Sequence, residues 1–194
     1  MKLREIGNKQ FFDKGRLSKC YLLDDGNILK LFNQPKKLYE MDMFKYFLQY
    51  KNDSFIFPFE FIYDSRKFYG YIMPKAPGKT LFQVFSKSNL LDLSKHSYKL
   101  EEDIDFISDG GIALYDLHDK NVLYDENKYS VIDHDENAVS NNLLRVKQFN
   151  HSTHRLLISD LFLDNIENEK HTKLIRENIS KYKNIFIRPS EMIL

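Results

Sequence analysis

The chain has 194 residues, a formal net charge of +1 and a single cysteine, which suits one domain or two small lobes in a reducing cytoplasm and excludes an internal disulfide. The near balance of charge argues against binding to nucleic acid. No apolar run approaches the roughly 18 residues of a membrane span, and the polar N-terminus lacks the apolar core of a cleaved signal peptide.

The first third of the chain predicts antiparallel strands interrupted by one helix. Two apolar runs are joined by Asp25-Gly26, a dipeptide typical of tight hairpins because the turn needs a positive φ. Apolar residues at helical spacing predict a helix that begins near Pro35. The expected elements are a strand at about residues 3–12, a hairpin over 18–32, a helix over 34–52 and a hairpin of aromatic strands over 55–73.

The composition changes at residues 74–78, where two prolines and a glycine indicate a hinge. The hinge would separate an N-terminal lobe, residues 1–73, from a C-terminal lobe, residues 79–194. We therefore expect an α+β fold with a small β-rich lobe that contains one helix, followed by a reduced and mostly helical lobe.

The second lobe has helical periodicity on both sides of one hairpin. Gly110-Gly111 is expected to end its main helix, because glycine readily adopts the positive φ of a helix C-terminus. The amphipathic helices of the tail are expected to pack on this lobe, and binding of a partner protein is the alternative. The expected helices cover residues 80–87, 99–109, 154–166 and 170–182.

Polar side chains in residues 111–136 have a spacing that suits phosphoryl transfer. Asp116 is followed five residues later by Asn121, and Asp133 follows an apolar run after a short hairpin. One carboxylate can orient a hydroxyl, while an amide oxygen and a second carboxylate can hold Mg²⁺ against phosphates. An acidic surface turn is the alternative for any one of these residues alone, and it is the interpretation we give to Asp125 and Glu126.

The stretch 111–136 resembles the catalytic loop and metal-binding strand of the protein-kinase-like fold, which is bilobal. The resemblance implies that Asp116 is the catalytic aspartate and that Asn121 and Asp133 hold Mg²⁺ with ATP. His118 occupies the position of a lysine that contacts the γ-phosphate in serine/threonine kinases. Asp160 resembles the aspartate that anchors the catalytic loop, although an exposed helix aspartate is the alternative.

The first lobe extends this resemblance. Lys30 interrupts an apolar strand where the family has the lysine that contacts the α- and β-phosphates, unless it is an ordinary strand lysine that faces solvent. Its expected helix partner is Glu40, with Asp42 as the second candidate and a solvated helix face as the alternative. Gly15 is the one glycine retained from the glycine-rich loop, and an ordinary turn explains it equally well.

The hinge segment resembles the part of the family that binds adenine. Met73 lies near the gatekeeper position and Lys75 follows it, so both are candidate cofactor-binding residues, with a generic linker as the alternative. The chain departs from the family at Leu114 and Tyr115, which replace His and Arg. It also has Asp-His-Asp at 133–135 in place of Asp-Phe-Gly, and it lacks the motif that ends a conventional activation loop.

Three functions agree with this pattern. The first is a compact bacterial serine/threonine protein kinase of the effector type, which would be cytoplasmic or secreted without a cleaved signal. Its partners would be a protein substrate of unknown identity and a host or regulatory protein. The second is a small-molecule phosphotransferase of the aminoglycoside- or choline-kinase type, whose spelling "DLHxxN" the chain shares. The third is a pseudokinase that only binds. We expect the first. Only about thirty residues separate the hinge from the catalytic loop, which leaves out the extra helices of small-molecule kinases, and a protein that only binds would not need Lys30, Asp116, Asn121 and Asp133 together.

Overall fold

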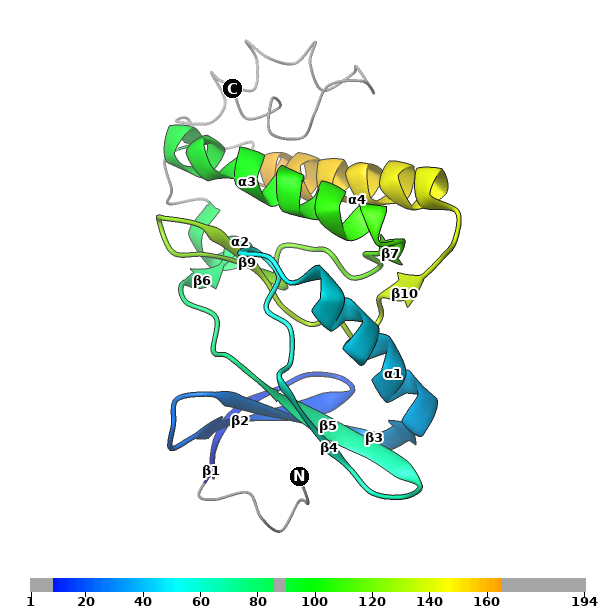
Figure 1. Ribbon diagram of the computed structural model, residues 1–194. Coiled ribbons are helices and arrows are strands. Elements are labelled where there is room, and N and C mark those ends of the chain that lie inside the picture. Colours follow the sequence, from blue (N-terminus) through cyan, green and yellow to red (C-terminus); the bar gives the residue numbers. More distant parts are fainter. Residues whose placement is uncertain (1–8, 86–89, 165–194) are drawn as a thin grey trace. The chain divides into compact units, whose positions relative to one another are not determined.

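The computed structural model describes residues 9–85 and 90–164 of the chain (Figure 1). Within them the fold is mixed α+β, with a five-stranded antiparallel sheet and four α-helices, which confirms the expected class. The chain divides into two compact units. Unit 1 comprises Met1–Lys51 and Ile56–Ala76, and unit 2 comprises Asn52–Phe55 and Pro77–Leu194.

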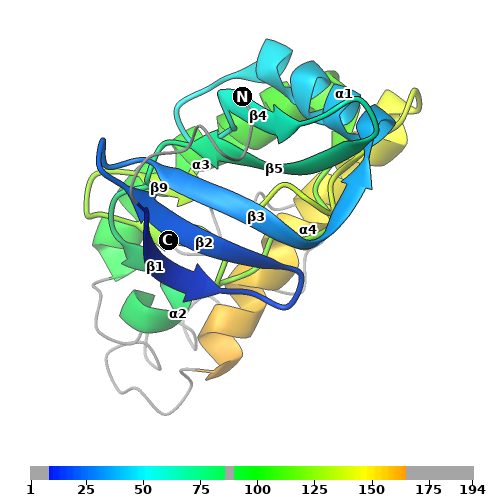
Figure 2. The same cartoon turned by 90° about the horizontal axis from the view of Figure 1, so that it is seen from below.

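Unit 1 contains the five-stranded sheet, whose strands lie in the order β1-β2-β3-β5-β4 (Figure 2). Gly26 has a φ of 82° in the turn between β2 and β3, so the hairpin predicted at Asp25-Gly26 is confirmed. The predicted hairpin of aromatic strands is also confirmed. The strands are β1 (Lys9–Lys14), β2 (Ser18–Leu23), β3 (Ile28–Lys37), β4 (Glu60–Tyr63) and β5 (Lys67–Met73).

Helix α1, Leu38–Phe47, begins later than the sequence predicted and leads into a single 3₁₀ turn, Leu48–Tyr50. The prediction that the helix starts near Pro35 is wrong because β3 continues to Lys37, which pairs with Lys67 across the sheet. The helix then starts where the Glu40 carboxylate accepts a hydrogen bond from the Lys37 N–H at 2.9 Å.

Aromatic packing connects α1 to one face of the sheet. The Phe44 ring lies 5.7 Å from that of Phe68 and 5.2 Å from that of Tyr71, and all three side chains are fully buried. The opposite face has a smaller cluster of Leu29 and Ile72, together with Ile62 from β4. Successive side chains of β3 therefore point to opposite faces of the sheet, as the strand period of two requires.

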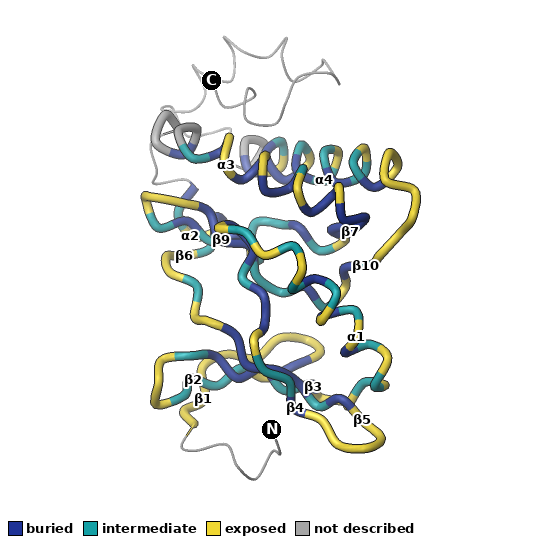
Figure 3. The backbone as a smooth tube through the Cα atoms, viewed as in Figure 1, coloured by how far each residue is buried: buried dark blue, intermediate teal, exposed yellow. Residues whose placement is uncertain are grey.

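Unit 2 is built on two long helices that lie side by side (Figure 1). Buried positions recur along both of them (Figure 3). The main helix ends as predicted, because Gly111 adopts a φ of 70° and donates its N–H to the Ser108 carbonyl. The helices are α2 (Leu81–Val84), α3 (Leu90–Asp109) and α4 (Leu143–Asp164).

Three short ladders complete unit 2. The hairpin predicted around Asp125 is confirmed, since β8 pairs with β9 in antiparallel register. The ladders comprise β6 (Lys79–Thr80) with β8 (Val122–Tyr124), β8 with β9 (Tyr129–Val131), and β7 (Ile112–Ala113) with β10 (Ala138–Val139). The helix predicted at residues 170–182 lies outside the described residues, as does the end of the one predicted at 80–87. No helix in the described part of the chain is long and apolar enough to cross a bilayer.

Candidate functional site

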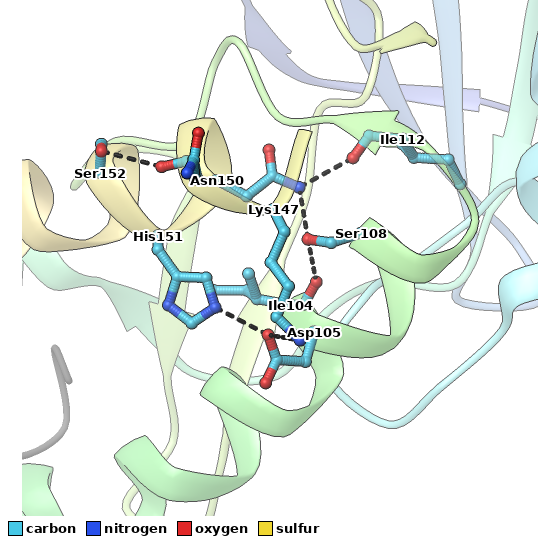
Figure 4. Close-up of polar contacts among 9 residues, drawn as sticks. Ile104, Asp105, Ser108, Ile112, Lys147, Asn150, His151 and Ser152 are labelled. Carbon is cyan, nitrogen blue, oxygen red and sulfur yellow. Dashed lines mark hydrogen bonds and ion pairs between the residues drawn. The ribbon is translucent and has the colours of Figure 1, made fainter. Parts of the chain in front are cut away.

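Residues 114–121, which we call the Asp116 loop, connect β7 to β8 and are fixed at their start by an asparagine of α4. Asn150 Oδ1 accepts a hydrogen bond from the Leu114 N–H at 2.8 Å. Its Nδ2 donates to the Ile112 carbonyl and to Ser108 Oγ, also at 2.8 Å (Figure 4). Its side chain is 0 % exposed. One amide thus satisfies buried polar groups at the end of α3, in β7 and at the entry to the loop.

Sequence reasoning missed Asn150. The available signal was its place on α4, four residues after Val146 and four before His154, both of which are buried. A polar residue within a buried helical stripe indicates a hydrogen-bond partner elsewhere in the fold. The sequence could not say that the partners lie 36 to 42 positions away.

A second close approach holds the other side of the loop's base. A Cβ built on Gly111 would lie 2.3 Å from the Ser140 carbonyl oxygen, and the two residues are joined by a hydrogen bond from the Ser140 N–H to the Gly111 carbonyl. Only glycine allows the residue before β7 and the residue after β10 to meet this closely at a φ of 70°.

Asp116 and Asn121 are in direct contact. Asn121 Nδ2 donates to Asp116 Oδ2 at 2.8 Å and to the Asp116 carbonyl at 3.1 Å. Both contacts use the amide nitrogen, so the amide oxygen of Asn121 is the atom left for a cation. Both residues are half-buried. The structure therefore brings together two of the residues that the sequence placed in one site.

His118 approaches the other oxygen of the same carboxylate. Its Nδ1 accepts a hydrogen bond from the Lys120 N–H at 3.2 Å, and its Nε2 lies 3.3 Å from Asp116 Oδ1. A lone pair must be on Nδ1 to accept that bond, which assigns the proton of the neutral ring to Nε2. His118 Nε2 therefore faces Asp116 Oδ1, the carboxylate oxygen opposite the one that Asn121 bonds. Asp119 lies farther away, with Oδ1 3.6 Å from Nδ1.

Asp133 is brought next to this group by backbone pairing. The Ile132 N–H donates to the Asn121 carbonyl at 2.9 Å, directly after the ladder in which Val122 pairs with Val131. Asp133 itself has a φ of 62°, a left-handed conformation that is uncommon outside glycine. Such backbone strain is typical of functional sites.

His134, the residue that departs from Asp-Phe-Gly, is a core residue. Its ring is buried, with its centroid 5.8 Å from that of Phe55, and its Nδ1 lies 3.3 Å from Asn137 Nδ2. It fills an apolar position with an aromatic ring, which is the packing that phenylalanine would provide. Asp135 is half-buried.

Lys30 lies on β3 in unit 1 and is only 3 % exposed, with its ammonium 5.8 Å from the centre of the Tyr71 ring. It is therefore not a lysine that faces solvent. Glu40 is half-buried, and besides bonding the Lys37 N–H it lies 3.8 Å from Lys36 Nζ. Asp42 is exposed and bonds Lys45 on the next turn at 3.0 Å.

The candidate nucleotide-binding residues Gly15, Met73 and Lys75 also belong to unit 1. Gly15 begins the turn between β1 and β2, and its N–H donates to the Ser18 carbonyl at 3.0 Å. Met73 ends β5 as a buried residue. Lys75 is exposed, with its ammonium 5.5 Å from the centre of the Phe12 ring.

Asp160 is exposed on α4, and its carboxylate makes no hydrogen bond or ion pair with the described residues. The anchoring of the Asp116 loop, for which Asp160 was the sequence candidate, is carried out by Asn150.

The geometry thus gathers Asp116, His118, Asn121 and Asp133 in unit 2, while the other candidates are described only within unit 1. Three or more His, Cys, Asp or Glu side chains do not converge as a metal site anywhere in residues 9–85 and 90–164. The predicted cation ligands form a smaller set, one carboxylate and one amide oxygen, which suits a cation that keeps several waters, as Mg²⁺ does.

No protein-family model matches this chain, and no curated protein matches its sequence.

Proposed function

We propose that the protein is an ATP- and Mg²⁺-dependent phosphotransferase with a kinase-like bilobal fold, and that its acceptor is a serine or threonine hydroxyl of a protein. The observation that carries the proposal is the convergence of two side chains on the Asp116 carboxylate: Asn121 donates to Oδ2, and His118 Nε2 lies 3.3 Å from Oδ1. Asp133, close by in the same unit, has a left-handed backbone. An acidic surface turn needs no such convergence of side chains.

Asp116 would orient the acceptor hydroxyl and take its proton. Oδ2 accepts one hydrogen bond from Asn121 and Oδ1 faces His118 Nε2 at 3.3 Å, so each oxygen retains capacity for the acceptor. Because the donors approach opposite oxygens, the carboxylate is fixed in one orientation before the acceptor binds. That preorganisation lowers the entropy that must be lost on the way to the transition state.

Asn121 and Asp133 would hold Mg²⁺, which neutralises phosphate charge when it is bound. The amide of Asn121 fits this role because its nitrogen is committed to Asp116. Asp133 supplies the carboxylate, and its left-handed backbone sets it apart from the strand that precedes it. Both ligands are hard oxygen donors, as Mg²⁺ prefers.

Lys30 would contact the α- and β-phosphates. Burial of its ammonium on a strand supports the assignment, since buried lysine is rare and is usually paired with an anion. Glu40 stays a candidate brace for Lys30, and the two contacts of its carboxylate with Lys36 and Lys37 are compatible with a structural role at the helix start. Gly15, Met73 and Lys75 are proposed to contact the nucleotide through the same resemblance.

His118 acts through Asp116 in this proposal. The expectation from the family was a contact with the γ-phosphate. The position of its Nε2, 3.3 Å from Asp116 Oδ1, instead favours a positioning role, because the Nε2 side of the ring faces that carboxylate.

The proposal is tested with the full chain, labelled ATP and Mg²⁺, using a generic protein acceptor and, separately, amino sugars and amino alcohols. We expect transfer to protein hydroxyls, a thermal shift with Mg-ATP, and loss of transfer in Asp133→Asn. A thermal shift without transfer would replace the proposal with a pseudokinase. Transfer only to small hydroxyl compounds would replace it with a small-molecule phosphotransferase, and neither shift nor transfer would overturn it.

A further inference from the structure

A pocket of about 390 Å³ lies between α4 and the Asp116 loop, entirely within unit 2. Helix α4 contributes residues spaced at i, i+3, i+4, i+7 and i+8, which is a single helical face. The loop contributes the three residues that follow Asp116. The lining residues are Leu117, His118, Asp119, Thr153, Leu156, Leu157, Asp160 and Leu161.

The pocket combines an apolar wall with two carboxylates. Leu117, Leu157 and Leu161 are buried and provide the wall. Asp160 is exposed and makes no hydrogen bond within the described residues, while Asp119 lies 3.6 Å from the ring of His118. A ligand with an aliphatic stem and a cationic end satisfies both surfaces at once, and Arg and Lys side chains have this construction.

The pocket is next to the proposed catalytic carboxylate. His118 lines it, and the Nε2 of this residue lies 3.3 Å from Asp116 Oδ1. An acceptor whose hydroxyl reaches Asp116 would therefore bring its neighbouring groups to this pocket.

We infer that the pocket binds a basic side chain of the polypeptide acceptor, close in sequence to the phosphorylated hydroxyl. The inference rests on the proposed function and names its substrate class. A polypeptide suits the pocket better than a free amino sugar, because Leu156 on its rim is 61 % exposed. Small-molecule sites normally enclose most of their ligand, whereas a peptide needs only one side chain inserted.

The test measures both transfer and binding. Serine peptides that carry one Arg at successive offsets from the serine are compared with matched Ala peptides, as substrates and, with a fluorophore, in anisotropy titrations. We expect one offset to be preferred. For that peptide, Asp160→Asn and Asp119→Asn should raise KM and Kd by about tenfold each, the scale of one charge-assisted hydrogen bond.

Two controls separate this effect from general damage. Asp109→Asn makes the same change at an exposed position at the end of α3, and it should leave KM and Kd unaltered. The KM for ATP should stay the same in all three variants. Asp160→Lys should reverse the preference, so that a peptide with Glu at the same offset binds better than the Arg peptide.

The outcomes distinguish the two proposals. Transfer with equal efficiency to Arg and Ala peptides overturns the inference and leaves the proposed function standing. Binding of the Arg peptide that depends on Asp160, without any transfer from ATP, supports the pocket and overturns the proposed function. If Asp160→Asn raises KM only for amino sugars, the polypeptide assignment is overturned. It is also overturned if the pocket binds a second copy of the chain.

Discussion

The hairpin turn at Asp125 and the loop at Asp116 belong to the same acidic stretch, yet they are held in different ways. Asp125 Oδ1 accepts hydrogen bonds from the N–H groups of Asn127 and Lys128, its near neighbours, and Glu126 beside it is exposed. The Asp116 carboxylate accepts a hydrogen bond from the side chain of Asn121 and lies 3.3 Å from His118 Nε2. Local backbone bonds explain a turn completely, whereas converging side chains need a further reason.

The contacts that hold the Asp125 turn are local, whereas those that hold the Asp116 loop are long-range. The side-chain hydrogen bonds of Asp125 stay within residues 125–128, while the Asp116 loop is bonded by Asn150, 36 positions away, and its base closely approaches Ser140. This difference between local and long-range support can be tested by matched substitutions, which follow from the largest expected effect to the smallest.

Glycines provide the strongest test of long-range support. Gly26 and Gly111 both have positive φ, but a Cβ on Gly26 meets nothing within 4 Å, whereas one on Gly111 would lie 2.3 Å from the Ser140 carbonyl oxygen. We expect Gly26→Ala to cost about 1 kcal/mol of unfolding free energy and Gly111→Ala at least about 3 kcal/mol, measured by urea denaturation. Equal losses would contradict the assigned close approach.

Asn150 is the next largest case. Asn150→Leu should lower the free energy of unfolding by about 3 kcal/mol, because the buried N–H of Leu114 and carbonyl of Ile112 lose their partner. Asn127→Ala in the exposed turn should cost less than about 0.5 kcal/mol. Chemical denaturation of both variants checks this, and a loss at Asn150 no larger than that at Asn127 would show that the loop has another anchor.

His154 makes stability depend on pH. Burial, assisted by the charge of His151, lowers the pKa of His154 from 6.5 to about 3. Between pH 6.5 and about pH 3, His154 is therefore protonated in the unfolded chain but neutral in the folded chain. The free energy of unfolding falls as the pH falls below 6.5, by up to about 1.4 kcal/mol per pH unit. His154→Leu should remove this part of the slope in denaturation measured from pH 7 to pH 4. An unchanged slope would show that His154 is protonated in the fold.

His118 tests the positioning role. His118→Ala should lower kcat about tenfold, the equivalent of one charged hydrogen bond, with KM for ATP unaltered. Gln places its amide N–H near the position of Nε2, so His118→Gln should recover most of kcat, while Asn places it near Nδ1 and should not. A rise in KM for ATP in His118→Ala would instead favour the γ-phosphate contact.

Much of the fold could be predicted from the sequence because its signals are local. The Asp25-Gly26 turn, the aromatic hairpin and the helix stop at Gly110-Gly111 depend on neighbouring residues. The start of α1 was misjudged because pairing of Lys37 with Lys67 extends β3 beyond Pro35, and that pairing is a tertiary contact.

The candidate site was predictable to a similar extent. Their spacing, together with the resemblance to the kinase-like motif, singled out Asp116, Asn121 and Asp133, which the structure brings together in one unit. The role of Asn150 and the tautomer of His118 were not predictable, because each depends on hydrogen-bond geometry that the spacing of residues does not contain.

The most direct test of the central claim is the rate of phosphoryl transfer from labelled ATP at saturating Mg-ATP, compared between Asp116→Asn and Asp125→Asn. Both variants keep an oxygen that can accept the local hydrogen bonds, so both should fold. We expect Asp116→Asn to lose about 10³-fold in rate, the scale of a general base with its orientation, and Asp125→Asn to retain the wild-type rate. Equal rates in the two variants would contradict the claim that Asp116 is the catalytic carboxylate.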